Sequence, residues 1–174
     1  MRKILLSLFF ILLIFIIFHV YSNDHDLTKI SEEINNHLKQ GNKYYNNAVI
    51  AINSNDTYSA SKNCENAISE YKTVQNLTLL ALSEGKNDEV FNRYLNLVLK
   101  DIENRINAVN ELKLAIEMIS NGKNVTAREH VKNANYYMLV SENLEKEREK
   151  IMKQYPQKFI QVYLLVLDLG LYVA

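Results

Sequence analysis

The stretch 91-FNRYLNLVLKDIENRINAVNELKLAIEMIS-120 decides the fold. Its large apolar residues recur with alternating steps of four and three, which is the spacing of one buried stripe on an α-helix. The stripe consists of Phe91, Leu95, Val98, Ile102, Arg105, Val109, Leu112, Ile116 and Ile119. Residues 87–89 supply a helix cap and an acidic first turn, and Gly122 ends the segment. A long helix with a single apolar stripe is marginal alone in water, so we expect it to pack against other helices.

Three further segments carry the same kind of stripe. They run from about Leu27 to Asn53, from about Tyr58 to Glu84, and from Thr126 to just before Pro156. The second stripe consists of Ala60, Cys64, Ala67, Tyr71, Val74, Thr78 and Ala81. Thr126 and Glu129 match a capping box, which predicts the start of the last helix. Short polar turns separate the segments, so the sequence predicts an all-α, up-down-up-down four-helix bundle over residues 23–155.

The two halves of this bundle resemble each other when Ala48 is aligned with Ala115, a shift of 67 positions. The same shift aligns Ile52 with Ile119, Ala60 with Ala127, Asn66 with Asn133, Ala67 with Ala134, Asn76 with Asn143, and Leu77 with Leu144. We interpret the match as a duplicated αα-hairpin. Two heptad helices also share some register by chance, which is the alternative interpretation.

The chain begins with an apolar run, Ile4 to Val20, that follows Arg2 and Lys3. A membrane-spanning helix needs ~20 apolar residues, whereas the apolar core of a secretory signal has ~7–15. Residues 1–22 therefore fit a signal peptide cleaved after Ser22, or an uncleaved membrane anchor. Because the positive end stays in the cytoplasm, we expect residues from about Asn23 onward to be extracytoplasmic, in a protein of the cell membrane or a secreted one.

A second apolar run follows the bundle within residues 156–174. It extends from Phe159 to Ala174 and contains one charge, Asp168. As a helix it would be ~24 Å long, which is shorter than a hydrocarbon core of ~30 Å. Two interpretations stay open: a partial membrane segment, or a tail packed on the bundle or on a dimer partner.

The composition argues against most chemical functions. The formal net charge is zero, so no strong attraction to nucleic acid is expected. Cys64 is the only cysteine, which excludes an internal disulfide and a cysteine-based metal site. Paired Glu-x-x-His motifs, a Cys-x-x-Cys-His motif and a glycine-rich phosphate loop are all missing from the sequence. We therefore predict no catalytic residues, no cofactor and no enzymatic activity, and we place His37 and His130 on the solvated surface.

Two kinds of modification or metal site can be predicted from short motifs. Asn55, Asn76 and Asn124 each begin an Asn-x-Thr sequon, so each is a candidate glycosylation site in an exported protein. Cleavage after Ser22 would leave His25 as the third residue of a free amino terminus, an arrangement of nitrogen ligands suited to Cu(II) or Ni(II). An incidental histidine near a chain end is the alternative for His25.

Three residues are candidates for a polar site in the bundle core. Arg105 carries the only charge on its stripe, and Tyr45 and Tyr71 lie on neighbouring stripes. Together they could line a site for a small anion or organic ligand. The alternative, which we favour, is that Arg105 extends outward while Ile106 turns inward, and that the tyrosine hydroxyls reach the rim of the bundle.

These observations predict a non-enzymatic, membrane-associated helical bundle that acts as a structural or partner-binding surface domain, with a protein partner or a second copy of the chain. Two apolar runs flanking four long helices also resemble the periplasmic four-helix module of bacterial chemoreceptors. That resemblance implies a sensory ectodomain as an alternative. A carrier that holds a small molecule or metal in the bundle core is a third hypothesis.

Overall fold

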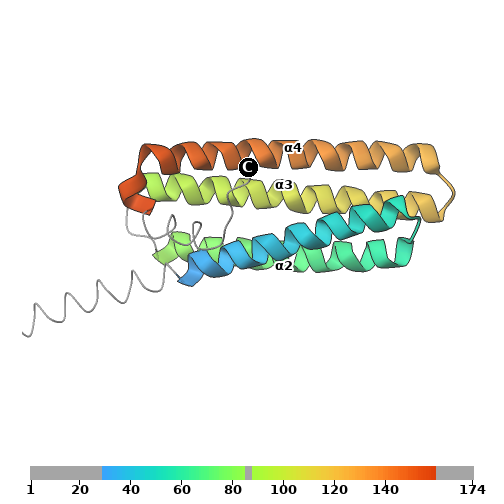
Figure 1. The fold of residues 1–174 in the computed structure, drawn as a ribbon, viewed down its shortest axis with the longest axis horizontal. Helices are drawn as coiled ribbons and strands as arrows, with labels where there is room; N and C mark the ends of the chain where they lie inside the picture. The colour runs from blue at the N-terminus through green and yellow to red at the C-terminus, as the bar shows by residue number, and fades with distance from the viewer. Residues whose placement is uncertain (1–28, 85–87, 160–174) are drawn as a thin grey trace, which may run out of the picture.

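The computed structural model describes residues 29–84 and 88–159, and these residues form helices joined by short turns (Figure 1). The first helix covers residues 29–53, and a last helical turn covers residues 156–159. Between them lie α2 (Thr57–Glu84), α3 (Glu89–Ser120) and α4 (Asn124–Gln154). The predicted all-α helical bundle is confirmed for this part of the chain. The predicted signal or anchor, residues 1–22, lies outside it.

Successive helices run in opposite directions along the bundle (Figure 1). The start of the first helix, the end of α2, the start of α3 and the end of α4 lie at one end. The turns that join the first helix to α2 and α3 to α4 lie at the other end, which we call the turn end. α3 packs against both α2 and α4.

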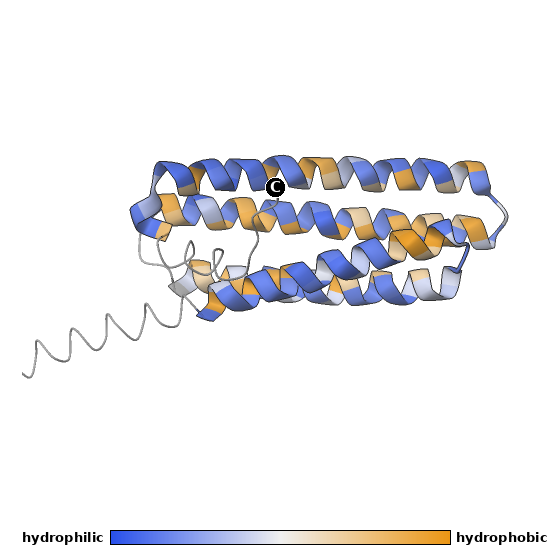
Figure 2. Ribbon diagram, in the orientation of Figure 1, coloured by the Kyte–Doolittle hydropathy of each residue, from blue (hydrophilic) through white to orange (hydrophobic). Residues whose placement is uncertain are grey.

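The predicted stripes form the core. All seven residues of the α2 stripe are buried, as are the α3 residues from Leu95 to Ile116 that lie on its stripe. α4 is largely hydrophilic and is the exception (Figure 2). Its buried residues are mostly small or polar, and they are Ala127, Ala134, Ser141, Arg148 and Ile151. Large residues of α3 therefore fill the space beside a helix that contributes little apolar volume.

The two turns at the turn end share one geometry. Asn55 has φ 58° and Gly122 has φ 71°, so both lie in the left-handed region. The backbone N–H of Asn55 donates to the carbonyl of Ile52 at 3.0 Å, and that of Gly122 donates to the carbonyl of Ile119 at 2.9 Å. With the bonds from Asp56 to Ala51 and from Lys123 to Met118, these contacts define a Schellman motif in each turn. Every one of these donors and acceptors in the first turn has its counterpart 67 positions later in the second.

Burial repeats with the same shift of 67 positions. In several pairs both members are buried and apolar or glycine: Ile30 and Leu97, Gly41 and Ala108, Tyr45 and Leu112, Ala48 and Ala115, Ala60 and Ala127, and Ala67 and Ala134. The first helix with α2, and α3 with α4, thus form two hairpins whose inner faces use equivalent positions.

Two helix starts were predicted from capping residues in the part of the chain that the structure describes, and one of these is confirmed while the other is wrong. The Asp88 carboxylate accepts hydrogen bonds from the backbone N–H groups of Val90 at 3.0 Å and Phe91 at 3.1 Å, as predicted for a capping residue. α4 does not begin at Thr126. It begins at Asn124, directly after the Schellman turn, and Lys123 makes no side-chain cap. The turn therefore sets this boundary in place of the capping-box residues.

The first residue of the predicted apolar tail packs on the bundle. Phe159 is 1% exposed, and its ring centroid lies 5.1 Å from that of Tyr94 and 6.4 Å from that of Phe91. Lys158 pairs with Asp88 beside it. The rest of the tail, residues 160–174, lies outside the described residues. Within residues 29–84 and 88–159, no helix combines the length and the apolar character that a membrane crossing requires.

Candidate functional site: a buried polar cluster

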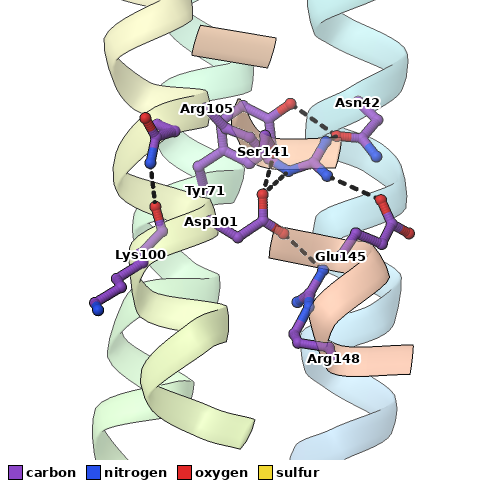
Figure 3. Close-up of polar contacts among 9 residues, drawn as sticks. Asn42, Tyr71, Lys100, Asp101, Arg105, Ser141, Glu145 and Arg148 are labelled. Carbon is purple, nitrogen blue, oxygen red and sulfur yellow. Dashed lines mark hydrogen bonds and ion pairs between the residues drawn. The ribbon is translucent and has the colours of Figure 1, made fainter. Parts of the chain in front are cut away.

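Asp101 lies at the centre of the polar interior and is 0% exposed. Its Oδ1 accepts a hydrogen bond from Arg105 Nε at 2.8 Å and another from the Ser141 hydroxyl. Its Oδ2 accepts a hydrogen bond from Arg148 Nη2 at 2.7 Å (Figure 3). The carboxylate on α3 therefore binds one cation on its own helix and two donors on α4.

Arg105 extends the cluster to the other two helices. Its Nη1 donates to Asn42 Oδ1 on the first helix at 2.8 Å, and the Tyr71 hydroxyl on α2 donates to the same oxygen at 2.9 Å (Figure 3). Its Nη2 lies 3.4 Å from Glu145 Oε2 at the rim. We call Asn42, Tyr71, Asp101, Arg105, Ser141, Glu145 and Arg148 the polar cluster. All four long helices contribute to it.

The cluster contains more buried positive than negative charge. Asp101 faces two buried guanidinium groups, and the second carboxylate, Glu145, is 51% exposed. Burial acts to lower the pKa of Arg105, but Asp101, together with Tyr71 and Glu145, more than offsets it and raises that pKa above its ordinary value. Arg105 therefore stays charged, and the core depends on Asp101 to compensate it.

The geometry of the polar cluster suits a role in holding the helices together better than a catalytic role. Three donors occupy the Asp101 carboxylate, and Asn42 Oδ1 accepts two hydrogen bonds. A buried network with its groups paired in this way fixes the relative positions of the elements that carry it. Removing one member would leave a buried charge or donor unpaired.

The structure brings two of the three predicted core residues together. Arg105 and Tyr71 meet at Asn42, whereas the buried Tyr45 hydroxyl has no hydrogen-bond partner among the described residues. Our favoured expectation that Arg105 extends outward is wrong, because it is 3% exposed. Acceptors on its own helix and on the first helix hold it inside, and Ile106 stays half-buried.

Sequence reasoning missed Asn42, Asp101 and Arg148. The buried spacing Ala127, Ala134, Ser141 continues by seven to Arg148, so extending that stripe into the charged segment would have found it. Asp101 precedes Arg105 by four residues, and this spacing places the Asp101 carboxylate and the Arg105 guanidinium on the same helix face. No local signal identifies Asn42, because its role depends on a residue of a distant helix.

The two histidines of the described region keep partly exposed side chains, and each also pairs with a glutamate that the prediction did not include. His37 Nδ1 lies 2.6 Å from Glu70 Oε2, and His130 Nδ1 lies 2.8 Å from Glu111 Oε2. Each pair joins the two helices of one hairpin. No group of three or more potential metal ligands occurs within residues 29–84 and 88–159.

The other predicted sites remain predictions. Asn55, Asn76 and Asn124 are exposed, with Asn55 and Asn124 at the turn end and Asn76 on α2, so an attached glycan would meet no core residue. His25 lies outside the described residues.

Comparison of the chain with protein-family models, with curated proteins and with solved structures finds no match. The class that the fold and the cluster define is thus an all-α bundle with a buried ionic core.

Buried acidic groups predict a loss of stability at alkaline pH. Burial raises the pKa of Cys64 to about 11 and the pKa values of Tyr45 and Tyr71 to about 12. Because the folded chain keeps these protons where the unfolded chain loses them, their stabilisation is complete below about pH 9 and is lost as pH rises towards 12. We expect the free energy of unfolding, measured with urea at a series of pH values, to fall by a few kcal/mol over this range.

The variant Cys64→Ala is the control for this prediction. Without the thiol, whose ordinary pKa is 9.0, the decline should start near the ordinary tyrosine value of 10.0, about one pH unit later. A constant unfolding free energy between pH 9 and 11 in the unmodified protein would contradict the prediction.

Proposed function

We propose that this protein is an exported, membrane-associated helical bundle that acts by contact, as a structural or partner-binding surface domain without enzymatic activity. The observation that carries the proposal is the closed polar cluster. The polar groups gathered around Asp101 bind one another, so the cluster presents no free nucleophile or base to a substrate. The bundle offers its outer surface for recognition instead.

The direction of the helices supports attachment at one end. The apolar residues 4–20 precede the first helix in sequence, and the apolar residues 159–174 follow α4. The first helix starts, and α4 ends, at the end opposite to the turns (Figure 1). If either apolar run meets a membrane, the turn end points away from it.

Exposed apolar side chains near the turn end support a contact role there. Tyr58 is 77% exposed, Val125 is 76% exposed and Ile50 is 62% exposed. Single exposed apolar residues are ordinary on a protein surface, but these three lie within two helical turns of the same end. A protein surface is the partner class that such residues fit.

We also propose that the two hairpins arose by duplication. The repeated Schellman turns and the repeated burial pattern support this interpretation more strongly than the identities between aligned residues do, because backbone geometry and register agree at the same shift.

A cysteine-accessibility experiment tests the proposed location. Cys64 is buried, so a new cysteine at the exposed turn, Asn121→Cys, would be the accessible thiol among the described residues. In intact cells of the native host we expect a membrane-impermeant maleimide to label this variant but not the unmodified chain. Labelling that appears only after the cells are permeabilised would overturn the proposal of an extracytoplasmic bundle.

The sensory ectodomain is the second candidate, supported by the two apolar runs that flank the four long helices in the sequence. Modules of that type work as dimers. Size determination of the full chain in mild detergent distinguishes the two, because a strict monomer at all concentrations contradicts the sensory hypothesis and leaves the contact role intact.

A further inference from the structure

The two hairpins present nearly interchangeable inner faces. We call the first helix with α2 the N-terminal hairpin, and α3 with α4 the C-terminal hairpin. Because buried positions repeat at a shift of 67, like hairpins of two copies of the chain could pack together as unlike hairpins do within one copy. Some feature of the core must favour the unlike pairing.

The polar cluster is the feature that breaks this equivalence. Asp101, Arg105, Ser141 and Arg148 of the C-terminal hairpin align with Ile34, Leu38, Val74 and Ala81 of the N-terminal hairpin. In the other direction, Asn42 and Tyr71 align with Val109 and Met138. The C-terminal hairpin therefore supplies the buried charges, and the N-terminal hairpin supplies the acceptor for Arg105.

We infer that the polar cluster selects the pairing of unlike hairpins and excludes the pairing of C-terminal hairpins from two copies of this chain. In a pair of C-terminal hairpins, Arg105 Nη1 would meet Val109 in place of the Asn42 oxygen that it binds at 2.8 Å. Two guanidinium groups would then face each other in the core. Each Asp101 already binds three donors of its own hairpin and could compensate neither excess charge.

Pairing of two N-terminal hairpins would leave no buried charge without a partner. Asn42 Oδ1 would keep its hydrogen bond from Tyr71, since both residues belong to that hairpin. Each pair of N-terminal hairpins, however, leaves two C-terminal hairpins that must pair with each other. The cost of leaving Arg105 without an acceptor therefore opposes any assembly of two chains through like hairpins. This inference does not depend on the function proposed above.

Residues that the chain already uses at the equivalent positions provide the test. The fourfold variant D101I/R105L/S141V/R148A gives the C-terminal hairpin the apolar inner face of the N-terminal one. We would measure the mass of the full chain in mild detergent by light scattering and sedimentation, over a hundredfold range of concentration. The unmodified chain should keep one mass, whereas the fourfold variant should stay helical and rise to at least twice its lowest mass.

The single variant Ser141→Val is the matched control, because it adds apolar volume beside Asp101 and leaves both ion pairs in place. It should keep the mass of the unmodified chain. A helical fourfold variant that keeps a single mass over the whole range would overturn the inference. Loss of the helical circular dichroism signal would also overturn the inference, and so would irreversible aggregation of a variant that keeps this signal. In either case the two inner faces would not be interchangeable.

Discussion

Replacing Asp101 by asparagine is expected to lower the free energy of unfolding by about 3 to 5 kcal/mol. The substitution keeps the shape of the side chain but removes the one fully buried negative charge that faces Arg105 and Arg148. Both guanidinium groups would stay buried, and the new amide would turn two N–H donors towards other donors. Urea denaturation followed by circular dichroism measures the loss, which corresponds to roughly 10 °C in the melting midpoint.

The variant Glu145→Gln is the control for the loss of a negative charge. Its carboxylate is 51% exposed and 3.4 Å from Arg105, so solvent screens the pair and we expect a change below about 1 kcal/mol. An equal effect of the two variants would show that burial of Asp101 is not what makes its charge important.

Replacing Gly41 by alanine is expected to lower the free energy of unfolding by about 2 kcal/mol. A Cβ atom at Gly41 would lie 2.5 Å from Tyr71 Cε1 and 2.7 Å from Cδ1. The ring is fully buried and Asn42 holds its hydroxyl, so it has little freedom to move. The crowding should exceed the ~1 kcal/mol that alanine gains over glycine in a helix.

The second hairpin indicates how to relieve this crowding. At the positions equivalent to Gly41 and Tyr71 the chain has Ala108 and Met138. The double variant G41A/Y71M should therefore be at least 1 kcal/mol more stable than the sum of its two single variants predicts, measured by urea denaturation in a double-mutant cycle. Additive effects would mean that the alanine finds room by another adjustment of the helix.

The sequence predicts the apolar part of this core well, because helical periodicity alone decides which side of a helix faces inward. The α2 stripe from Ala60 to Ala81 is buried throughout, and the first helix ends at Asn53 as expected. The predicted start at Thr126 was wrong because the preceding turn determines where the next helix begins.

The polar part of the core cannot be predicted from helical periodicity, because its contacts join residues that are distant in the sequence. Whether Arg105 extends outward or inward depends on Asn42, 63 residues earlier, and on the carboxylate one turn away. Periodicity placed Arg105 on the stripe, but only the packing of four helices shows which acceptors surround it. Asp101 lies beside the stripe and Arg148 lies in a segment rich in charge, so neither stands out in the sequence as a buried residue.

The two Schellman turns have a consequence for how this protein can change over evolutionary time. Each turn requires a left-handed residue, Asn55 or Gly122, so a side chain at Gly122 would strain the backbone even though a Cβ atom there would have no neighbour within 4 Å. The side chains of residues 53–56 and 120–126 are exposed, whereas the polar cluster lies near the middle of the long helices. Substitutions of the other exposed residues at the turn end are therefore expected to perturb folding little, so natural selection can diversify that surface while Asn55, Gly122 and the core stay fixed.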